Sequence, residues 1–558
     1  MLFRSAWLPM YVYDEYDQKM VDERVAQYRD QTNRFLAGKL PAEEFQHLRL
    51  RNGLYIQRLA PMLRIAVPYG LMSSRQLRKL AYITRHFDRG YAHLTTRQNV
   101  QLNWPLLEEV PDILEELASV EMHAIQSSGN CIRNVTSDQY AGVAQDEIED
   151  SRPWAEIIRQ WSTFHPEFNW LPRKFKIAVS SATQDRAAVQ VHDIGVRILN
   201  NDGVTRFEIL AGGGLGRTPV IAPVIRQNLE PKHLLTYLEA ILRVYNRYGR
   251  RDNKYKARIK ILVRAMTPAV FAEKVDAEWQ TLKDGVGTLT DTEISRVKGH
   301  FTIPPYETLD DHVPEIDDRI ADNSGFSNWL KQNVKPHKQA GYAIVNLALK
   351  QTGIPPGDIT DKQLETVADL ADEFSFGEAR VTHEQNLTLA DVPKRSLFSL
   401  WQALVSAELA TPNLGLLTDI ICCPGGDYCS LANAKSIPVA EAIQRQFDDL
   451  DSLHVLGDLD LNISGCMNAC GHHHVGNIGI LGVDKKGKEF YQVSIGGSGF
   501  EDASLAKILG PSFARNEIPD VIQKLVNVHL DKREGAERFL DTYRRIGIDP
   551  YKQAVYTS

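Results

Sequence analysis

The sequence has no long hydrophobic run and no strong excess of either charge. Of its 558 residues, 43% are hydrophobic and 24% are charged, and the net charge is -7, as in an ordinary globular protein. No segment approaches the roughly 18 apolar residues of a membrane span, and residues 1–18 are too polar for a secretory signal. We therefore expect a cytoplasmic protein that binds neither membrane nor nucleic acid, with Met10 as an alternative start.

Cysteine is scarce, with six residues in the whole chain, which argues against a disulfide framework. Five of the six lie between Cys422 and Cys470. In a large cytosolic chain such a cluster indicates metal binding or catalysis, because that compartment keeps thiols reduced. The chain is also longer than one hydrophobic core usually organises, so we expect several lobes.

The chain carries an internal repeat, because residues 76–99 align without a gap to residues 363–386. Each copy predicts a helix, a glycine turn and a strand with alternating apolar residues. A weaker echo follows in residues 206–216 and 490–500, which both predict a strand that runs into a glycine-rich turn. The aligned identities are Gln76, Leu77, Ala81, Phe87, Gly90, Ala92, Thr95, Gln98 and Asn99 with Gln363, Leu364, Ala368, Phe374, Gly377, Ala379, Thr382, Gln385 and Asn386.

The repeat predicts an α+β fold of two related halves, each a small unit followed by a larger lobe, with a cofactor between the halves. We place a helical extension at residues 1–50, the small units at 51–120 and 336–412, and the lobes at 121–335 and 413–558. A polar, proline-containing connection is expected near residues 300–340. Arg97 in the first copy aligns with Glu384 in the second, so the first half is expected to keep the anion chemistry.

Four of the cysteines form two spaced pairs. Cys423 and Cys429 are a C-x5-C pair, and Cys466 and Cys470 are a C-x3-C pair. Four thiolates are the natural ligand set of a 4Fe-4S cluster. Zinc is the rival, although structural zinc sites favour shorter spacers than the first pair has.

The residues around these pairs have plainer interpretations. Cys422 adjoins Cys423 and is expected to be a buried neighbour rather than a ligand. Gly465, Asn468 and Gly471 allow tight turns whose amides donate to the sulfurs. His472, His473 and His474 are interpreted as turn residues beside the cluster, because four cysteines already complete its coordination.

The C-x5-C pair followed by G-C-x-N-x-C-G resembles the siroheme-dependent nitrite and sulfite reductases, and among them the assimilatory sulfite reductase hemoproteins. The resemblance covers nearly the whole chain, through TTRQN (95–99), GNCIRNV (129–135), LPRKFK (171–176), GGGLGRTP (212–219) and both cysteine pairs. It implies that the small units are ferredoxin-like half-domains that pair as one unit, with the two larger lobes around a central cofactor site.

The resemblance also implies the cofactors and their ligands. Siroheme and a 4Fe-4S cluster are expected, with Cys423, Cys429, Cys466 and Cys470 on the cluster. Cys470 is expected to donate the same sulfur to the siroheme iron. The implied reaction is the six-electron reduction of sulfite to sulfide.

Sulfite must lose oxygen as water, so its site needs fixed positive charge and proton donors. The resemblance assigns these roles to Arg64, Arg133, Lys174 and Lys176. The sequence KFK supports the assignment independently, because in a strand both lysines point to one face and Phe175 points to the other.

Siroheme carries eight carboxylates, which require basic side chains and backbone amides. Residues 247–260 could instead be an exposed basic helix, and GGGLG alone is a weak anion-loop motif because it lacks the GxGxxG spacing. The candidates for binding siroheme are Arg97, Gln98, Gln101, Gly213, Gly214, Arg217, Lys256, Arg258 and Asn468.

Two other functions remain open. A nitrite reductase would use the same cofactors, and Lys176 is the discriminating residue because nitrite enzymes of this family often have asparagine there. A non-catalytic iron-sulfur carrier or zinc scaffold would leave the anion-binding residues unexplained. No flavin-binding or nicotinamide-binding motif is present, so an electron donor, either a flavoprotein subunit or ferredoxin, is an expected partner.

Overall fold

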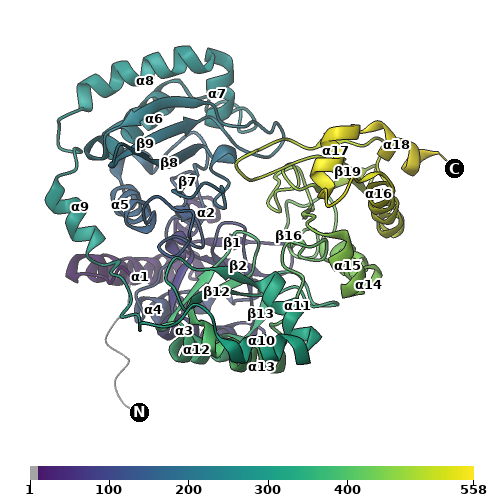
Figure 1. Cartoon of the computed structure of the whole chain (residues 1–558). Coiled ribbons are helices and arrows are strands. Elements are labelled where there is room, and N and C mark those ends of the chain that lie inside the picture. The colour runs from purple at the N-terminus through teal and green to yellow at the C-terminus, as the bar shows by residue number, and fades with distance from the viewer. Residues whose placement is uncertain (1–9, 558) are drawn as a thin grey trace.

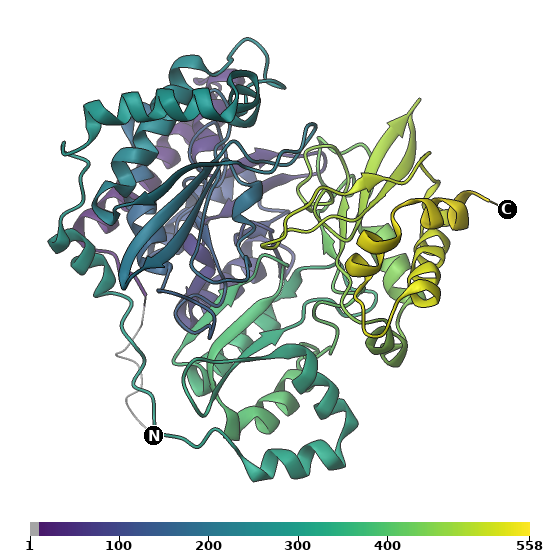
Figure 2. The same ribbon diagram turned by 45° about the horizontal axis from the view of Figure 1, so that its top comes forward.

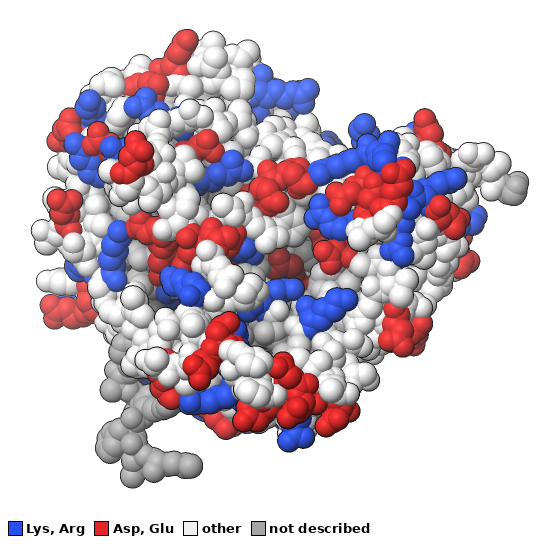
Figure 3. Space-filling view, viewed as in Figure 1, with Lys and Arg blue, Asp and Glu red and all other residues white. Residues whose placement is uncertain are grey.

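The computed structural model describes residues 10–557 and divides the chain into three lobes (Figure 1). The half-domains lie together in one lobe, and the two larger lobes rise from it, with the C-terminal lobe on the right of Figure 1. No helix in the described chain is long and apolar enough to cross a membrane. Acidic and basic side chains are interspersed on the face that Figure 3 shows.

Two five-stranded sheets form the half-domain lobe, and each contains one strand from the other half of the chain. Strand β3 of the first repeat pairs with β14 of the second, and β13 of the second repeat pairs with β4 of the first. The strand orders are β1(Leu54–Ile56)-β2(Pro61–Ile65)-β5(Val100–Leu102)-β4(Tyr91–Leu94)-β13(Asp358–Thr360) and β11(Val334–Pro336)-β12(Tyr342–Leu347)-β15(Leu387–Pro393)-β14(Glu378–Val381)-β3(Leu71–Ser73). The exchange makes the two half-domains one folding unit.

The repeated helices begin in the same way. Helix α3 (Ser74–Phe87) has a capping box between Ser73 and Gln76, and α12 (Asp361–Phe374) has one between Thr360 and Gln363. Each box satisfies otherwise unpaired N–H groups of the first turn. The predicted helices and the internal duplication are therefore confirmed.

Further helices cover this lobe and bury one continuous core. The helix α11 contributes Phe326 and Trp329, both fully buried. The segment expected as a polar connection near 300–340 therefore contains two helices, α10 and α11. Helix α11 packs on the core because its apolar residues Phe326 and Trp329 share one helical face. The helices are α1 (Glu15–Leu36), α2 (Ala42–Arg51), α4 (Val110–Ala118), α10 (Pro314–Asp322), α11 (Ser324–Asn333) and α13 (Leu397–Ser406). Residues 1–9 of the predicted extension lie outside the described residues.

The two larger lobes share one sheet topology, in which three parallel strands are followed by two antiparallel ones (Figure 2). The first lobe has β6(Thr136–Ser137), β7(Ile177–Ser180), β8(Ile194–Asn201), β9(Val204–Ala211) and β10(Val224–Leu229), with α5 (Arg152–Ser162), α6 (Leu234–Tyr248), α7 (Ile259–Met266), α8 (Pro268–Leu282) and α9 (Asp291–Lys298). The second has β16(Ile421–Cys422), β17(Leu461–Ser464), β18(Ile478–Lys485), β19(Lys488–Ile495) and β20(Lys507–Ile508), with α14 (Ile437–Gln446), α15 (Leu450–Leu456), α16 (Ile518–Lys532), α17 (Phe539–Ile546) and α18 (Asp549–Tyr556).

The shared topology relates the lobes residue by residue. The N–H of Ile194 donates to the carbonyl of Lys176 at 3.1 Å, and the N–H of Ile478 donates to the carbonyl of Asp460 at 2.9 Å. Both bonds join the first residue of the third strand to the residue before the second strand. Lys176 and Asp460 therefore occupy equivalent positions, with opposite charge.

Candidate active site

Five basic side chains predicted from the sequence come together between the half-domains and the first large lobe. Arg64 belongs to β2, and Arg97 lies in the turn after β4. Arg133, Lys174 and Lys176 lie on extended chain that precedes β6 and β7, where the N–H of Arg133 donates to the carbonyl of Phe175 at 2.7 Å. The structure thus gathers residues that are far apart in the sequence.

The lysines of the KFK segment point away from Phe175, as predicted, since Phe175 is fully buried in the lobe core and both lysines are half-buried. Burial, opposed by Cys470 and assisted by Arg133 and Arg258, lowers the pKa of Lys174 to about 8. Burial also lowers the pKa of Lys176 well below its usual value, followed by the effects of Arg97 and Lys174. Such crowded cations favour a bound anion or loss of a proton.

The two arginines at this site are held by protein acceptors. Arg133 donates to the carbonyls of Gly129 and Ser127 at 2.7 and 3.0 Å. Arg64 donates to Oε1 of Gln101 at 2.9 Å, so Gln101 positions Arg64. No acidic group pairs with either guanidinium in the described chain.

Tyr55 is a member of this cluster that the sequence analysis missed. Burial raises the pKa of its phenol, but Arg133, Arg64 and Lys174 together outweigh burial and leave the pKa below its usual value. The guanidinium of Arg64 lies 5.6 Å from the centre of the Tyr55 ring. Tyrosine in a short strand gave no motif that could have revealed it.

Only some of the residues predicted to bind siroheme carboxylates lie beside the basic cluster. Arg97 is half-buried beside the lysines and donates to Thr136 Oγ1 at 3.0 Å, and burial lowers its pKa to about 9, followed by the effect of Arg133. Arg258 donates to Oδ1 of the buried Asp193 at 2.7 and 2.9 Å. Gln98 is buried, with its amide bonded to Ser137 N–H and the Val381 carbonyl.

The glycine loop that precedes Arg217 packs closely on protein backbone. A Cβ at Gly213 would lie 2.5 Å from the His192 carbonyl, and one at Gly214 would lie 2.6 Å from the Arg258 guanidinium. Lys260 donates from Nζ to the carbonyls of Gly214 and Leu215 at 3.2 and 2.7 Å, a contact that the sequence analysis missed.

The two remaining candidates for binding siroheme are exposed at the surface. Arg217 is exposed and donates to Met467 Sδ at 3.2 Å, and Lys256 is exposed. The run 247–260 is not an exposed basic helix, because α6 ends at Tyr248 and α7 begins only at Ile259.

The four predicted ligand cysteines lie together on the loops after β16 and β17. Burial, followed by the neighbouring Cys470, raises the pKa of Cys423 to about 12. The N–H of Gly465 donates to Cys423 Sγ at 3.2 Å, and Asn468 Nδ2 donates to Cys466 Sγ at 3.5 Å. Across the described residues, no three His, Cys, Asp or Glu side chains converge closely enough for a single metal ion, as a tetrahedral zinc site would require.

Cys422 precedes Cys423 directly and is 1% exposed, with its Sγ donating to the Cys423 carbonyl at 3.3 Å. Its N–H donates to Oε1 of Gln385 at 2.8 Å, as the N–H of Ser137 donates to Gln98 at 3.1 Å in the other half. It is therefore a buried core residue at the position of a serine.

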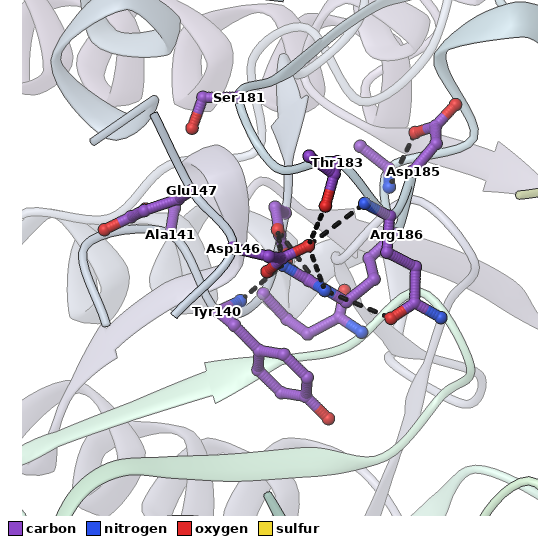
Figure 4. Close-up of polar contacts among 12 residues, drawn as sticks. Tyr140, Ala141, Asp146, Glu147, Ser181, Thr183, Asp185 and Arg186 are labelled. Carbon is purple, nitrogen blue, oxygen red and sulfur yellow. Dashed lines mark hydrogen bonds and ion pairs between the residues drawn. The ribbon is translucent and has the colours of Figure 1, made fainter. Parts of the chain in front are cut away.

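The first half has an ion-pair network where the second half has cysteines (Figure 4). Asp138 directly follows β6, as Cys423 directly follows β16, and Arg186 precedes β8 by eight residues, as Cys470 precedes β18. Arg186 donates to Asp138 at 2.8 Å and to Asp146 at 2.8 Å. Charged side chains thus fill the space in the first half.

Three histidines adjoin Arg97 and Lys176, of which His192 and His472 are buried and His383 is half-buried. The rings of His383 and His472 lie 4.7 Å apart, and burial lowers the pKa values of both, followed for His383 by Arg97 and for His472 by His383. His192 is also buried beside Arg97. His472 had been interpreted as a turn residue beside the cluster, whereas nothing in the sequence marked His192 or His383.

These residues fit an anionic tetrapyrrole beside an iron-sulfur cluster. Buried nitrogens of Arg64, Arg97 and His472 have no hydrogen-bond partner within the described chain, so carboxylates could serve as their acceptors. The Cys470 carbonyl accepts from Thr96 Oγ1 at 2.8 Å, which joins the cysteine loop to the turn that carries Arg97.

Comparisons with known proteins agree with this arrangement. Residues 128–283 and 416–558 match the family described as "Nitrite and sulphite reductase 4Fe-4S domain". Residues 57–120 and 346–407 match the "Nitrite/Sulfite reductase ferredoxin-like half domain". The chain belongs to the nitrite and sulphite reductase family. It is therefore an oxidoreductase with siroheme and a 4Fe-4S cluster as cofactors, and the prediction of duplicated ferredoxin-like half-domains is confirmed.

The relatives include both kinds of reductase. The chain is 29% identical over 484 residues to "Ferredoxin--nitrite reductase" of Synechococcus elongatus, covering 83% of this chain and 85% of that protein. It is 26% identical over 491 residues to "Sulfite reductase [ferredoxin] 1" of Mycolicibacterium paratuberculosis, covering 86% and 81%. The structure of the Mycobacterium tuberculosis NirA protein has the same fold, with a TM-score of 0.77, 24% identity and coverage of 96% and 97%.

Proposed function

We propose that this chain reduces sulfite to sulfide with six electrons from a separate donor protein. The observation that carries the proposal is that Lys176 lies beside Lys174 in a cluster with Arg64 and Arg133, with Cys470 close enough to influence both lysines. The ferredoxin-dependent names of the relatives support ferredoxin as the donor.

Cys423, Cys429, Cys466 and Cys470 would hold the cofactors, which would supply the electrons for the reduction. Arg64 and Arg133 hold sulfite oxygens through charge-assisted hydrogen bonds, because guanidinium groups match the paired oxygens of an anion. The overall change is hydrogen sulfite plus six electrons and six protons to hydrogen sulfide anion plus three waters.

The lysines handle the protons. Lys174, with its pKa lowered to about 8, still carries a proton on Nζ at neutral pH and can release it readily to a departing oxygen. Burial also lowers the pKa of Lys176 well below its usual value, so Lys176 is suited to pass protons in turn. Tyr55 lies among the same cations and contributes a hydroxyl to this network.

The remaining residues hold the cofactor. We assign Arg97 to a siroheme carboxylate, because its Nε is unpartnered and no carboxylate of the described chain pairs with it. Arg258 and the loop of Gly213 and Gly214 support the same edge, whereas the contacts of Gln98 and Gln101 indicate that they position the chain. Asn468 tunes the cluster through Cys466, and Arg217 and Lys256 have the weakest support.

Nitrite reduction to ammonia is the second candidate, favoured by relatives named nitrite reductases. Steady-state assays distinguish the two functions. They measure reduction of sulfite and of nitrite by the wild type and by Lys176→Asn, with reduced methyl viologen as donor. We expect a higher kcat/KM for sulfite that collapses in the variant. A wild-type preference for nitrite would replace the first function by the second.

A further inference from the structure

A pocket of about 440 Å³ lies on the far side of the chain segment that carries Arg133. Its walls come from the end of α2, residues 125–131 and residues 162–173, with Arg251 at one side. The first three residues of GNCIRNV and of LPRKFK line this pocket, whereas the proposed catalytic residues Arg133, Lys174 and Lys176 of the same segments do not.

The lining is positively charged. It includes Arg51, Arg173 and Arg251 but no Asp or Glu. The guanidinium of Arg51 lies 4.4 Å from the ring centre of Trp170, and Arg251 donates to the Trp170 carbonyl at 2.8 Å. The pocket is thus a preformed cationic surface around an exposed aromatic ring.

Arg173 faces further cations instead of a carboxylate. Burial lowers its pKa, and Arg133 and Arg258 lower it further. A guanidinium held among like charges is relieved by an anion, because the anion offsets the repulsion. The geometry therefore favours an anionic occupant.

The pocket and the catalytic cations share a wall. Gly129 and Cys131 line the pocket, while the carbonyl of Gly129 accepts two hydrogen bonds from Arg133. The carbonyl of Cys131 accepts from the N–H of Phe175 at 3.0 Å, between Lys174 and Lys176. An anion in the pocket is thus separated from the catalytic cluster by one turn of chain.

We propose that this pocket is an antechamber that captures the substrate oxyanion from solvent and delivers it to the catalytic cations. The inference rests on the proposed reduction of a small oxyanion. A pocket larger than such an ion lets it keep part of its water, so it can move on instead of being trapped. Three unpaired positive charges raise the local concentration of anions and the rate of capture.

The test measures kcat/KM for sulfite as a function of ionic strength in the holoenzyme, for wild type, Arg51→Ala and Arg173→Ala. At low salt we expect each variant to lose three- to tenfold in kcat/KM, mostly through KM, and to show a weaker dependence on salt. Arg173→Lys keeps the charge and should recover most of the loss. The siroheme and cluster absorption bands of each variant report whether the site is intact.

The matched control is Arg515→Ala, which removes an exposed arginine from the C-terminal lobe and should leave kcat/KM and its salt dependence at wild-type values. The antechamber is refuted if Arg51→Ala and Arg173→Ala behave like the control, or if Arg173→Lys loses as much as Arg173→Ala. If the wild type prefers nitrite, the proposed function fails, and the same variants measured with nitrite still decide the antechamber.

Discussion

Removing Arg186 should destabilise the first large lobe more than a typical surface substitution does. Arg186 is 8% exposed and Asp138 is 3% exposed. Arg186 Nε lies 3.0 Å from each carboxylate oxygen of Asp138, and its terminal nitrogens reach Asp146 at 2.8 and 3.3 Å. Arg186→Met preserves much of the side-chain volume but leaves the carboxylate of Asp138 buried without its partner.

Breaking a buried ion pair by removing one member costs about 3–5 kcal/mol. Asp146 is partly exposed, so its lost contact adds little. For a lobe of this size we expect the melting temperature to fall by roughly 6–20 °C. The double variant Asp138→Asn/Arg186→Met removes both charges and should recover part of that loss.

The assay is thermal unfolding followed by circular dichroism, with the siroheme absorption band recorded separately so that cofactor loss and unfolding are distinguished. The four proteins of the double-mutant cycle give the coupling energy between Asp138 and Arg186. A coupling near zero, or a single variant within about 1 kcal/mol of wild type, would contradict the view that this pair replaces the missing cluster structurally.

Three further predictions concern Glu384, Cys422 and Gln98. Burial, and then Asp419, raises the pKa of Glu384 to about 7. Its contribution to stability is therefore greatest below its unfolded-state pKa near 4.3 and declines as pH rises towards 7. Glu384→Gln should reduce the change in melting temperature between pH 5 and 7.5, and an unchanged pH dependence would refute the assignment to Glu384. Cys422→Ala should keep the cluster absorption that Cys423→Ala loses, because only Cys423 lies with the other ligand thiols. Gln98→Ala should lower stability by about 2–4 kcal/mol in urea unfolding, since it leaves the buried Ser137 N–H and Val381 carbonyl unpaired, whereas a loss of siroheme alone would make Gln98 a cofactor ligand.

The sequence predicted the repeated helices because their identities and capping residues are local signals. The KFK segment likewise predicted two lysines on one face, since alternation is a property of extended chain. The exchange of β3 and β13 could not be predicted, because strand pairing over such distances leaves no local pattern. His192 and His383 were missed for the same reason, as an isolated histidine has no spacing to interpret.

The equivalence of Arg186 and Cys470 was not predicted from the sequence repeat, because the two parts of the repeat have different offsets. Gln76 and Gln363 differ by 287 positions, whereas Ile194 and Ile478, which begin equivalent strands, differ by 284. A gapless alignment that finds the half-domain repeat therefore shifts the larger lobes out of register. The weaker similarity of residues 206–216 to residues 490–500 has the offset of 284 positions, and the shared sheet topology confirms that this offset pairs Arg186 with Cys470.

The duplicated scaffold provides equivalent positions in the two halves, and these positions carry opposite charges. Where the first half has Arg97 and Lys176, the second has Glu384 and Asp460, with the pKa of Asp460 raised to about 7 by burial and then by Asp419. In the second half, Lys350 Nζ donates to the carbonyls of Glu384 and Ile420 at 2.7 and 2.8 Å. An anion would meet the carboxyl groups of Glu384 and Asp460 there, whereas in the first half it would meet Arg97 and Lys176, which pair with no carboxylate of the described residues. Of these two equivalent positions, only the one in the first half therefore suits an anion, and it adjoins the four cysteines of the second half.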